Sequence, residues 1–440
     1  MASDASSSLP PSRPELQMAD AKPPLTSAEA RTEAERCLYC VESPCIAACP
    51  TAIDIPVFIR RIAEDNLRGA AATILEANIL GSSCARVCPV EVLCVGACVM
   101  NDWNRPPIEI GRLQRFAMDS AGEDPAALLE RRPSCGKRVA LVGAGPAALS
   151  AGACLVLAGC EAILFEKRAL PGGLNTTGVA PYKMHAHDAL REVERVESLG
   201  VELRLGVEVG KDVPVEDLIE GFDAVFLGVG LGPDAPLGLT GEDGPGVVGA
   251  TAWIERLKTS SDPPAAGVRR AVVVGGGNTA LDVVQELRHL GVEEVTLLYR
   301  RTREVMSGYP HELVRALELG ASMVENRVPV GVLRDGDALV GLRTAAAEDG
   351  RPLAGTEELL PADLVVVAIG QERFREWVGR FPGVKTDDSG RVAADPETGR
   401  TGNPKIFAGG DCRNGGMEVV NAVAEGKRAA EAMLRDWGIE

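Results

Sequence analysis

The sequence predicts an α/β protein in which a small, helical, cysteine-rich domain is followed by two doubly wound domains. Three observations lead to this prediction. Eight of the twelve cysteines fall between Cys37 and Cys98, in a region whose apolar residues recur at helical spacing. From Lys137 onward, short apolar strands alternate with helical stretches, a pattern typical of parallel sheets. Two of these strands run into glycine-rich turns, at Gly143 and at Gly275.

Length and charge narrow the class of protein. A chain of 440 residues is too long to fold around a single hydrophobic core and should divide into several domains. Its formal net charge of -17, without any basic run, opposes binding to nucleic acid and to anionic membranes, so neither partner is expected. No apolar run approaches the roughly 20 residues that span a bilayer, and no signal peptide is visible. We therefore expect a cytoplasmic protein whose thiols are reduced.

The N-terminal part is predicted to be a tail followed by a helical domain. Residues 1–25 are rich in Ser, Pro and Ala without hydrophobic periodicity, which predicts a disordered tail. Thr26 and Glu29 can form a capping box at the start of a helix that leads to Cys37. Helical spacing recurs further on, at residues 54–66, 69–78 and 108–120. The helical domain should therefore span residues 26–134.

The clustered cysteines fall into two sets, C-x2-C-x4-C-x3-C-P and C-x3-C-P-x5-C-x3-C. The first contains Cys37, Cys40, Cys45 and Cys49, and the second contains Cys84, Cys88, Cys94 and Cys98. Eight thiolates match the demand of two 4Fe-4S clusters, and a proline after the last cysteine is typical of bacterial ferredoxins, although their middle spacing is shorter. Zinc sites and disulfides are the alternatives that the spacing leaves open.

The first glycine-rich turn has the pattern G-x-G-x-x-A, directly after a strand and at the start of a helix. Its first glycine permits the turn, and its second admits a pyrophosphate that the helix N-terminus binds. Glu166 ends the next strand, where an acid accepts from a ribose 2'-hydroxyl and repels a 2'-phosphate. The turn therefore suits the adenosine half of FAD or NAD. The expected contacts are Gly143, Ala144, Gly145, Pro146, Ala147 and Glu166.

A distant segment decides between these two cofactors. Asp411 ends a strand and precedes a helix, which is where a flavoprotein contacts the ribityl and phosphate region, so FAD is predicted; a helix cap is the alternative. The helix that starts near Val419 should point its N-terminus at the flavin pyrimidine edge and favour negative charge there. The expected flavin contacts are Gly173, Leu174, Gly410, Asp411, Val419 and Val420.

The second glycine-rich turn, in "VVVGGGNTALD", indicates a second nucleotide. At the end of its next strand, Arg300 and Arg301 stand where the first site has an acid. Two guanidinium groups can bind a 2'-phosphate, which favours NADPH and leaves NADH possible; solvated surface charge is the alternative. The segment "VVVAIG" should lie where the nicotinamide meets the flavin. The expected contacts are Gly276, Gly277, Asn278, Thr279, Arg300, Arg301, Ala368, Ile369 and Gly370.

These two sites divide the remainder of the chain. An FAD-binding domain is expected over residues 135–233 and 364–440, with an inserted NAD(P)H-binding domain over residues 234–363.

The stretch from "CLYCVESPCIAACP" to "SSCARVCPVEVLCVGACVMN" resembles the iron–sulfur domain shared by dihydropyrimidine dehydrogenase and the small subunit of glutamate synthase. The resemblance covers nearly everything after the tail, and "GLNTTGVAPYKMHAHDALREVE" and "GGDCRNGGMEVVNAVAEGKRAA" favour the electron-input subunit of bacterial dihydropyrimidine dehydrogenases. It implies that one cluster is held by Cys37, Cys40, Cys45 and Cys98, and the other by Cys49, Cys88, Cys94 and Gln114. Counting thiolates alone would choose Cys84 in place of Gln114.

The resemblance also implies an oxidoreductase that works as one subunit of a hetero-oligomer. NADPH would pass a hydride to FAD, and single electrons would pass through two 4Fe-4S clusters to a larger partner. The favoured partner carries FMN and reduces uracil or thymine, and the small subunit of glutamate synthase is the alternative. No (β/α)8 barrel follows the second FAD segment, so we expect the chain to supply only electrons.

This chemistry needs no side-chain acid or base, so no catalytic residue is predicted, and the four histidines receive no role. A disulfide reductase of the thioredoxin reductase type would need a redox-active cysteine pair beside the flavin, and the four remaining cysteines form no CxxC. A non-enzymatic zinc-binding assembly protein is the alternative of another class, and it would be colourless.

Overall fold

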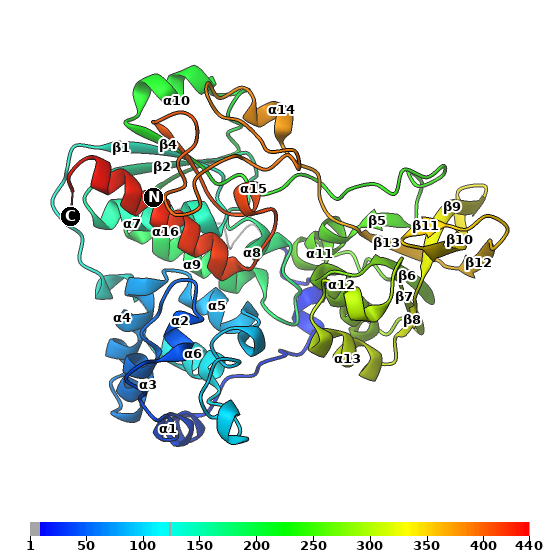
Figure 1. Ribbon diagram of the computed structural model, residues 1–440, viewed down its shortest axis with the longest axis horizontal. Coiled ribbons are helices and arrows are strands. Elements are labelled where there is room, and N and C mark those ends of the chain that lie inside the picture. Colours follow the sequence, from blue (N-terminus) through cyan, green and yellow to red (C-terminus); the bar gives the residue numbers. More distant parts are fainter. Residues whose placement is uncertain (1–8, 123–124, 440) are drawn as a thin grey trace.

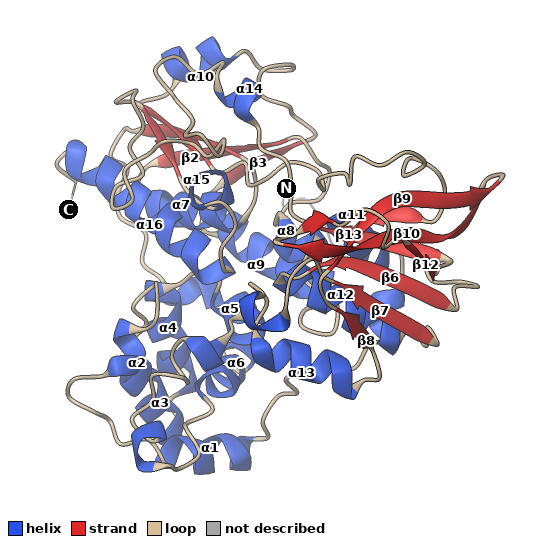
Figure 2. Cartoon of the chain, turned by 45° about the vertical axis from the view of Figure 1, so that its right-hand side comes forward, coloured by secondary structure: helices blue, strands red, loops and turns tan. Residues whose placement is uncertain are grey.

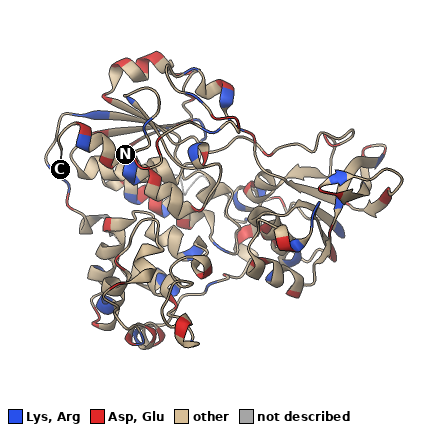
Figure 3. Cartoon of the chain, viewed as in Figure 1, with Lys and Arg blue, Asp and Glu red and all other residues tan. Residues whose placement is uncertain are grey.

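The computed structural model describes residues 9–122 and 125–439, and in it the chain forms three domains that meet around one central region (Figure 1). A helical domain comes first and lies below the first α/β domain in Figure 1, with the second α/β domain to the right. Lys and Arg are interspersed with Asp and Glu on all three domains (Figure 3). None of the described helices is long and apolar enough to cross a bilayer.

The helical domain is built from short helices with one apolar face. Thr26 and Glu29 form the predicted capping box, in which the Glu29 carboxylate accepts from the Thr26 amide at 2.8 Å. The apolar faces pack around Phe58, Ile74 and Leu113, which are fully buried. The elements are α1 Ser27–Glu35, α2 Pro44–Ala47, α3 Ile55–Ala63, α4 Leu67–Ala77, α5 Gly81–Val87, η3 Val90–Val92, η4 Asn101–Trp103, α6 Ile110–Asp119 and η5 Pro125–Leu128.

The segment before this domain differs from its prediction. The first eight residues lie outside the described part, but residues 9–25, here called the N-terminal segment, pack against the rest of the chain and include a short helix, η2 Pro14–Gln17. Glu15 is fully buried and accepts from the Ala186 amide at 2.9 Å. Asp20 pairs with Arg115 of the helical domain at 2.5 Å. The prediction of disorder is therefore wrong for residues 9–25, because these long-range polar contacts leave no trace in local composition.

The first α/β domain contains a parallel sheet with the strand order β14-β4-β1-β2-β3, and Figure 2 shows this sheet as a layer separate from the strands of the second α/β domain. Helix α16 packs so closely on α7 that a Cβ at Gly426 would lie 2.0 Å from the Ala147 carbonyl oxygen, which requires glycine there. The elements are β1 Arg138–Val142, α7 Pro146–Leu157, β2 Glu161–Glu166, α8 Leu174–Thr177, α9 Ala186–Ser198, β3 Glu202–Leu205, α10 Val215–Gly221, β4 Ala224–Leu227, α14 Arg375–Val378, β14 Ile406–Ala408, α15 Asp411–Asn414 and α16 Val419–Asp436.

The second α/β domain contains a parallel sheet of order β5-β13-β6-β7-β8. It also carries an antiparallel sheet, β9 to β12, that the sequence did not predict. The elements are β5 Val247–Gly249, α11 Ala250–Thr259, β6 Arg270–Gly275, α12 Asn278–His289, β7 Glu294–Leu298, η6 Arg303–Val305, α13 Pro310–Glu318, β8 Ser322–Val324, β9 Arg327–Asp335, β10 Ala338–Glu348, β11 Arg351–Pro352, β12 Glu358–Pro361 and β13 Leu364–Ala368.

One strand corrects the predicted domain boundary. Strand β13 pairs with β5 and β6, so it belongs to the second sheet, whereas the boundary after residue 363 assigned it to the FAD-binding domain. A buried parallel strand has the same apolar pattern in either sheet, and only its pairing partners reveal where it belongs. The inserted domain therefore extends to the end of β13.

Lys258, on α11 of the second α/β domain, links this domain to the first through buried hydrogen bonds. Its ammonium group is fully buried and donates to the carbonyl oxygens of Asn175, Val179 and Met184 at 3.0 to 3.1 Å. Burial lowers the pKa of Lys258 to about 8. The three carbonyls follow Leu174 in the chain, so this contact fixes a loop at the expected flavin site.

Replacing Lys258 by Met should lower the free energy of unfolding by about 2 to 4 kcal/mol, because three buried carbonyl groups lose their donor. Urea unfolding at pH 7 measures the change. Lys211→Met is the matched control, since Lys211 is 74% exposed and its ammonium group pairs only at 3.6 Å with Glu208. The control should change the free energy by less than about 0.5 kcal/mol. Equal effects would show that Lys258 does not hold the loop.

Candidate cofactor site

A cavity of about 870 Å³ lies where the three domains meet, within the usual size range of cofactor sites. It is lined by the first glycine-rich turn, by the start of helix α12 directly after the second turn, and by the end of helix α5. The predicted contacts that line it are Gly143, Ala144, Gly145, Pro146, Ala147, Glu166, Gly173, Leu174, Gly410, Asp411, Val419, Asn278 and Thr279.

The turn after β1 leaves room for a pyrophosphate. Gly143 has a φ of +96°, and a Cβ there would lie 2.6 Å from the Gly228 carbonyl oxygen, so only glycine fits. No described atom outside the turn lies within 4 Å of a Cβ placed on Gly145, which leaves space before the N-terminus of α7. The Glu166 carboxylate accepts from the Ala144 amide at 2.9 Å, which fixes it at the cavity edge. This arrangement fits the adenosine and pyrophosphate half of FAD.

Asp411 lines the cavity where the ribityl region is expected. Burial raises the pKa of Asp411 to about 6, and its Oδ1 accepts a long hydrogen bond, 3.4 Å, from the Met417 amide. Glu425 on α16 positions the preceding residue, because its Oε2 accepts from the Gly410 amide at 2.7 Å. Helix α16 begins at Val419, so its N-terminus faces the cavity as predicted from the sequence. The carboxylate of Asp411 thus has acceptor capacity left for a hydroxyl group.

The turn after β6 faces the same cavity through Asn278 and Thr279. A Cβ at Gly275 would lie 2.2 Å from the Ala368 carbonyl oxygen, so the end of β13 closes directly on this turn. The predicted contacts that do not line the cavity are Gly276, Gly277, Arg300, Arg301, Ala368, Ile369, Gly370 and Val420. All but Val420 belong to the predicted pyridine-nucleotide site, so the cavity covers only part of that predicted site.

Three polar contacts join the α/β domains across the cavity. The Tyr309 hydroxyl donates to Glu418 Oε1 at 2.7 Å. Lys183 pairs with Asp282 at 2.7 Å and with Glu312 at 2.8 Å. None of these residues was among the predicted contacts, because they meet only through the arrangement of the domains.

Arg300 and Arg301 follow the end of β7 and are exposed. Neither forms an ion pair with a residue that the structure describes, whereas the nearby Arg303 pairs with Glu325 at 2.7 Å. Two uncompensated guanidinium groups at this position fit the 2'-phosphate of NADPH.

In the helical domain, four cysteines surround one small pocket. Its lining includes Cys37, Cys40, Cys45 and Cys98, the set that the family resemblance assigns to one cluster. Burial raises the pKa of the Cys45 thiol to about 11, and the neighbouring Cys37 and Cys98 add to this shift. Iron binds such thiols as thiolates and compensates their mutual repulsion, so the donor set fits a cluster.

A second group, Cys49, Cys88 and Cys94, adjoins the first. Burial raises the pKa of Cys94 to about 12, and Cys49 and Cys45 add to the shift. A hydrogen bond with Cys84, together with burial, raises the pKa of Cys88. Cys45 of the first group therefore lies near Cys94 of the second group, as two adjacent clusters require.

Gln114 and Cys84 are the candidates for the eighth ligand. Gln114 is buried, and its Nε2 donates to the Gly81 carbonyl at 2.8 Å, while its Oε1 accepts no hydrogen bond from the described residues. Cys84 Sγ already accepts from Asn78 Nδ2 at 3.1 Å. A free amide oxygen and an engaged thiol favour Gln114, which stays a prediction. Val420, an expected flavin contact, packs against the buried cysteines of α5 instead.

The second cysteine group borders the cavity. Cys88 and Pro89 line it together with Leu174 and Val419. Lys22 of the N-terminal segment also lines it, and its Nζ donates to the Cys88 carbonyl at 3.1 Å. The sequence did not predict Lys22, because a single lysine in a Pro-rich segment carries no signal of a site. One cavity therefore reaches from both glycine-rich turns to a predicted cluster ligand.

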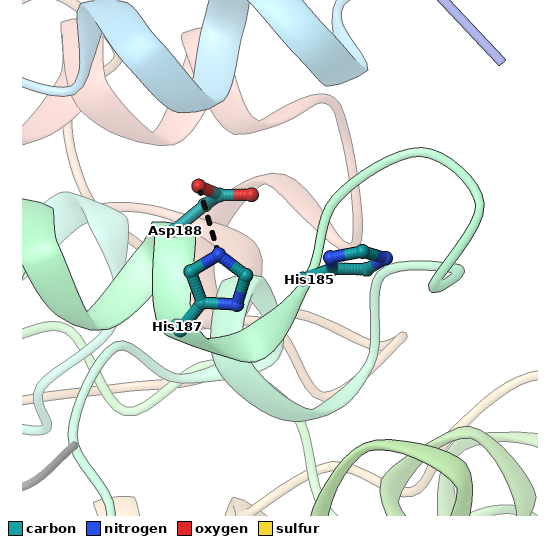
Figure 4. Close-up of side chains that lie close together, drawn as sticks. All are labelled: His185, His187 and Asp188. Carbon is teal, nitrogen blue, oxygen red and sulfur yellow. Dashed lines mark ion pairs between the residues drawn. The ribbon is translucent and has the colours of Figure 1, made fainter. Parts of the chain in front are cut away.

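One further group of polar side chains, formed by His185, His187 and Asp188, lies outside these sites (Figure 4). His187 Nε2 is 3.5 Å from the Asp188 carboxylate. Arg191 and Arg86 also approach this carboxylate, at 3.3 and 3.8 Å. Because two arginines already neutralise Asp188, we interpret this group of side chains as an ion-pair network.

Comparison with known proteins agrees with this division of the chain. Residues 15–125 match the family described as dihydropyrimidine dehydrogenase domain II, 4Fe-4S cluster, and residues 137–426 match the pyridine nucleotide-disulphide oxidoreductase family. The small chain of the NADPH glutamate synthase of Escherichia coli is 34% identical over 97% of this chain and 96% of its own length. The NAD-dependent dihydropyrimidine dehydrogenase subunit PreT of Escherichia coli is 34% identical over 93% of this chain and 95% of its own length.

This chain belongs to the family of these two subunits. Like them it is an NAD(P)H-dependent oxidoreductase, with FAD and 4Fe-4S clusters as its cofactors. Among solved structures, Mycobacterium tuberculosis FprA in complex with NADPH has a TM-score of 0.56 at 22% identity, over 70% of this chain and 85% of its own. That likeness confirms the predicted α/β fold.

Anaerobically prepared protein should hold about eight irons per chain, as two 4Fe-4S clusters require. Gln114→Ala should change the potential or the electron paramagnetic resonance signal of one cluster and leave the other unchanged, because only one cluster loses its amide ligand. Cys84→Ala is the matched comparison and should retain both clusters. Loss of a cluster in Cys84→Ala, with both retained in Gln114→Ala, would reverse the assignment, and stoichiometric zinc without iron would exclude clusters altogether.

Proposed function

We propose that this chain is the NADPH-oxidising, electron-input subunit of a dihydropyrimidine dehydrogenase, and that it serves a larger, FMN-bearing partner that reduces uracil and thymine. The observation that carries the proposal is the lining of the central cavity, which includes the first glycine-rich turn, Asn278 and Thr279 after the second turn, and Cys88 of the helical domain. A single chain can therefore hold a nicotinamide, a flavin and a cluster next to one another.

In this proposal the side chains bind and orient, and none has to transfer a proton. Bound FAD accepts a hydride from the nicotinamide and releases electrons singly to the clusters. The turn at Gly143 and the N-terminus of α16 hold the flavin cofactor, and the dipole of α16 favours negative charge there. Because Cys88 borders the cavity, the cluster that Cys49, Cys88 and Cys94 would help to hold would be the one nearer the flavin.

The other cluster lies nearer the surface and gives electrons an exit. Leu38 and Val41 flank Cys40 in the loop that holds it, with exposed fractions of 45% and 102%, and Trp103 is 57% exposed shortly after Cys98. Apolar side chains exposed together at a redox centre are typical of a protein–protein contact. We therefore place the docking of the partner subunit at this loop.

The choice of partner rests on the family. The family description for residues 15–125 names dihydropyrimidine dehydrogenase, and PreT relatives match along nearly their whole length. The free amide oxygen of Gln114 also suits the ligand set that the resemblance to dihydropyrimidine dehydrogenases implies.

The small subunit of glutamate synthase is the second candidate, and the paired arginines favour it. The relative from Escherichia coli is named as NADPH-dependent, whereas PreT is named as NAD-dependent. Arg300 and Arg301 suit the 2'-phosphate that distinguishes these nucleotides. In that case the partner would be a larger, glutaminase-bearing subunit.

Replacing both Arg300 and Arg301 by Gln should weaken NADPH binding by about 2 to 3 kcal/mol, because charge-assisted hydrogen bonds to the 2'-phosphate are lost. NADH binding should hardly change. Steady-state kinetics with an artificial dye and either nucleotide measure the effect. Arg269→Gln is the control, since Arg269 is 73% exposed in the same domain and directly precedes β6, at the opposite end of that strand from the glycine-rich turn. An equal loss for NADPH and NADH would show that the arginines do not contact the 2'-phosphate.

With a dye, the holoprotein should oxidise NADPH yet leave uracil and thymine unchanged, and addition of an FMN-bearing partner should start pyrimidine reduction. Val41→Glu should slow reduction through the partner without slowing dye reduction, because it places a charge in the proposed docking loop. Leu353→Glu is the control, since Leu353 is 41% exposed in the second α/β domain.

Two outcomes would change the proposal. Glutamate formation from glutamine and 2-oxoglutarate with a glutaminase-bearing partner, without any pyrimidine reduction, would establish the second candidate. Pyrimidine reduction by this chain alone would refute the division between an electron-input and a catalytic subunit.

A further inference from the structure

Four cysteines belong to neither predicted cluster and are not candidate ligands: Cys135, Cys154, Cys160 and Cys412. All twelve cysteines lie in the described residues, and all are free thiols. Cys135 and Cys160 differ from the other two because their Sγ atoms lie 3.1 Å apart, in direct contact. A disulfide bond is about 2.05 Å long, so the sulfurs would have to approach by only about 1 Å to be bonded.

The backbone on both sides holds this pair in place. Cys135 lies in the linker between the helical domain and β1, and Cys160 lies in the turn between α7 and β2. The linker amide of Cys135 donates to the Gly159 carbonyl at 3.0 Å, and the amide of Glu161 donates to the Lys137 carbonyl at 2.8 Å. The linker also passes so close that a Cβ at Gly159 would meet a linker carbonyl oxygen at 2.0 Å. The two sulfurs are therefore preorganised across two paired segments.

The two thiols differ in access. Cys160 is fully buried, and burial followed by the contact with Cys135 raises its pKa. Cys135 is half-buried in the linker and can meet a small solute. This asymmetry is the arrangement of an attacking and a resolving cysteine, because the accessible sulfur reacts first and the buried one follows.

We propose that Cys135 and Cys160 form a reversible dithiol–disulfide site that hydrogen peroxide oxidises. The Cys135 thiolate attacks one peroxide oxygen, the O–O bond breaks, and hydroxide leaves, so the sulfur becomes a sulfenic acid. The Cys160 sulfur then attacks the Cys135 sulfur, the S–O bond breaks, and water leaves with the thiol proton. In sum, two thiols and one peroxide give one disulfide and two waters, and a dithiol reductant reverses the change.

The bond would fasten the linker of the helical domain to the first α/β domain, and neither cysteine lines the central cavity. The site does not depend on the identity of the partner or of the nucleotide. It would respond to the peroxide that reduced flavins form with dioxygen, without using any cluster ligand.

The test treats the holoprotein anaerobically with a small excess of hydrogen peroxide, blocks free thiols with N-ethylmaleimide, and maps the peptides by mass spectrometry. A peptide pair linked through Cys135 and Cys160, lighter by two hydrogen atoms, is expected before cluster absorbance falls. It should revert with dithiothreitol. Cys154→Ser is the matched control, because Cys154 contributes to the surroundings of Cys160 without a sulfur contact, and it should keep the cross-link.

Cys135→Ser should abolish the cross-link, and it replaces a half-buried linker residue, so folding is not at risk as it would be at Cys160. Three results would overturn the proposal: Cys135 oxidised alone with Cys160 still free, a cross-link that persists in Cys135→Ser, or loss of iron before any cross-link forms. Dye reduction by the Cys135→Ser holoprotein, equal to that of the unaltered protein, would verify that the variant is folded.

Discussion

A buried carboxylate holds the helical domain against the first α/β domain, and the separation of the flavin site from the cysteine ligands depends on it. The two oxygens of Glu192 on α9 accept from the amides of Ser82 and Ser83 at 2.8 and 3.0 Å, at the start of α5. Burial raises the pKa of Glu192, and the hydrogen bonds from Ser83 and Ser82 oppose this shift. Asn175, next to the expected flavin contact Leu174, donates to the Ser83 hydroxyl at 3.0 Å. One residue thus fixes the flavin loop and the helix that leads to Cys88.

The helical domain changes what the two α/β domains can do. Two of the solved structures of similar fold cover 68% and 70% of this chain, a share close to that of the two α/β domains. In this chain the helical domain adds a wall to the cavity, formed by Cys88 and Pro89. The cavity of the nucleotide-binding domains thereby reaches the predicted cluster ligand Cys88, while the helical domain adds no strand to either parallel sheet.

The sequence predicted the features that depend on neighbouring residues. Glycine at the turn of Gly143 and the capping box of Thr26 follow from local geometry, and both are confirmed. Membership of β13 in the second sheet, and the roles of Lys22 and Glu192, depend on partners from about 65 to 110 residues away, which no local pattern records. The antiparallel sheet was missed for another reason, since its strands mix buried and exposed residues without regular alternation.

The path of the N-terminal segment constrains the order in which the chain can fold during synthesis. Its Glu15 and Ala21 contact Ala186 and Tyr182, and its Met18 enters the apolar core of the second α/β domain. The N-terminal segment is therefore synthesised well before the partners that it contacts, and α16, which packs on α7, is synthesised later still. Until then the first segment is exposed, so chaperone binding or proteolysis of the nascent chain should concentrate there.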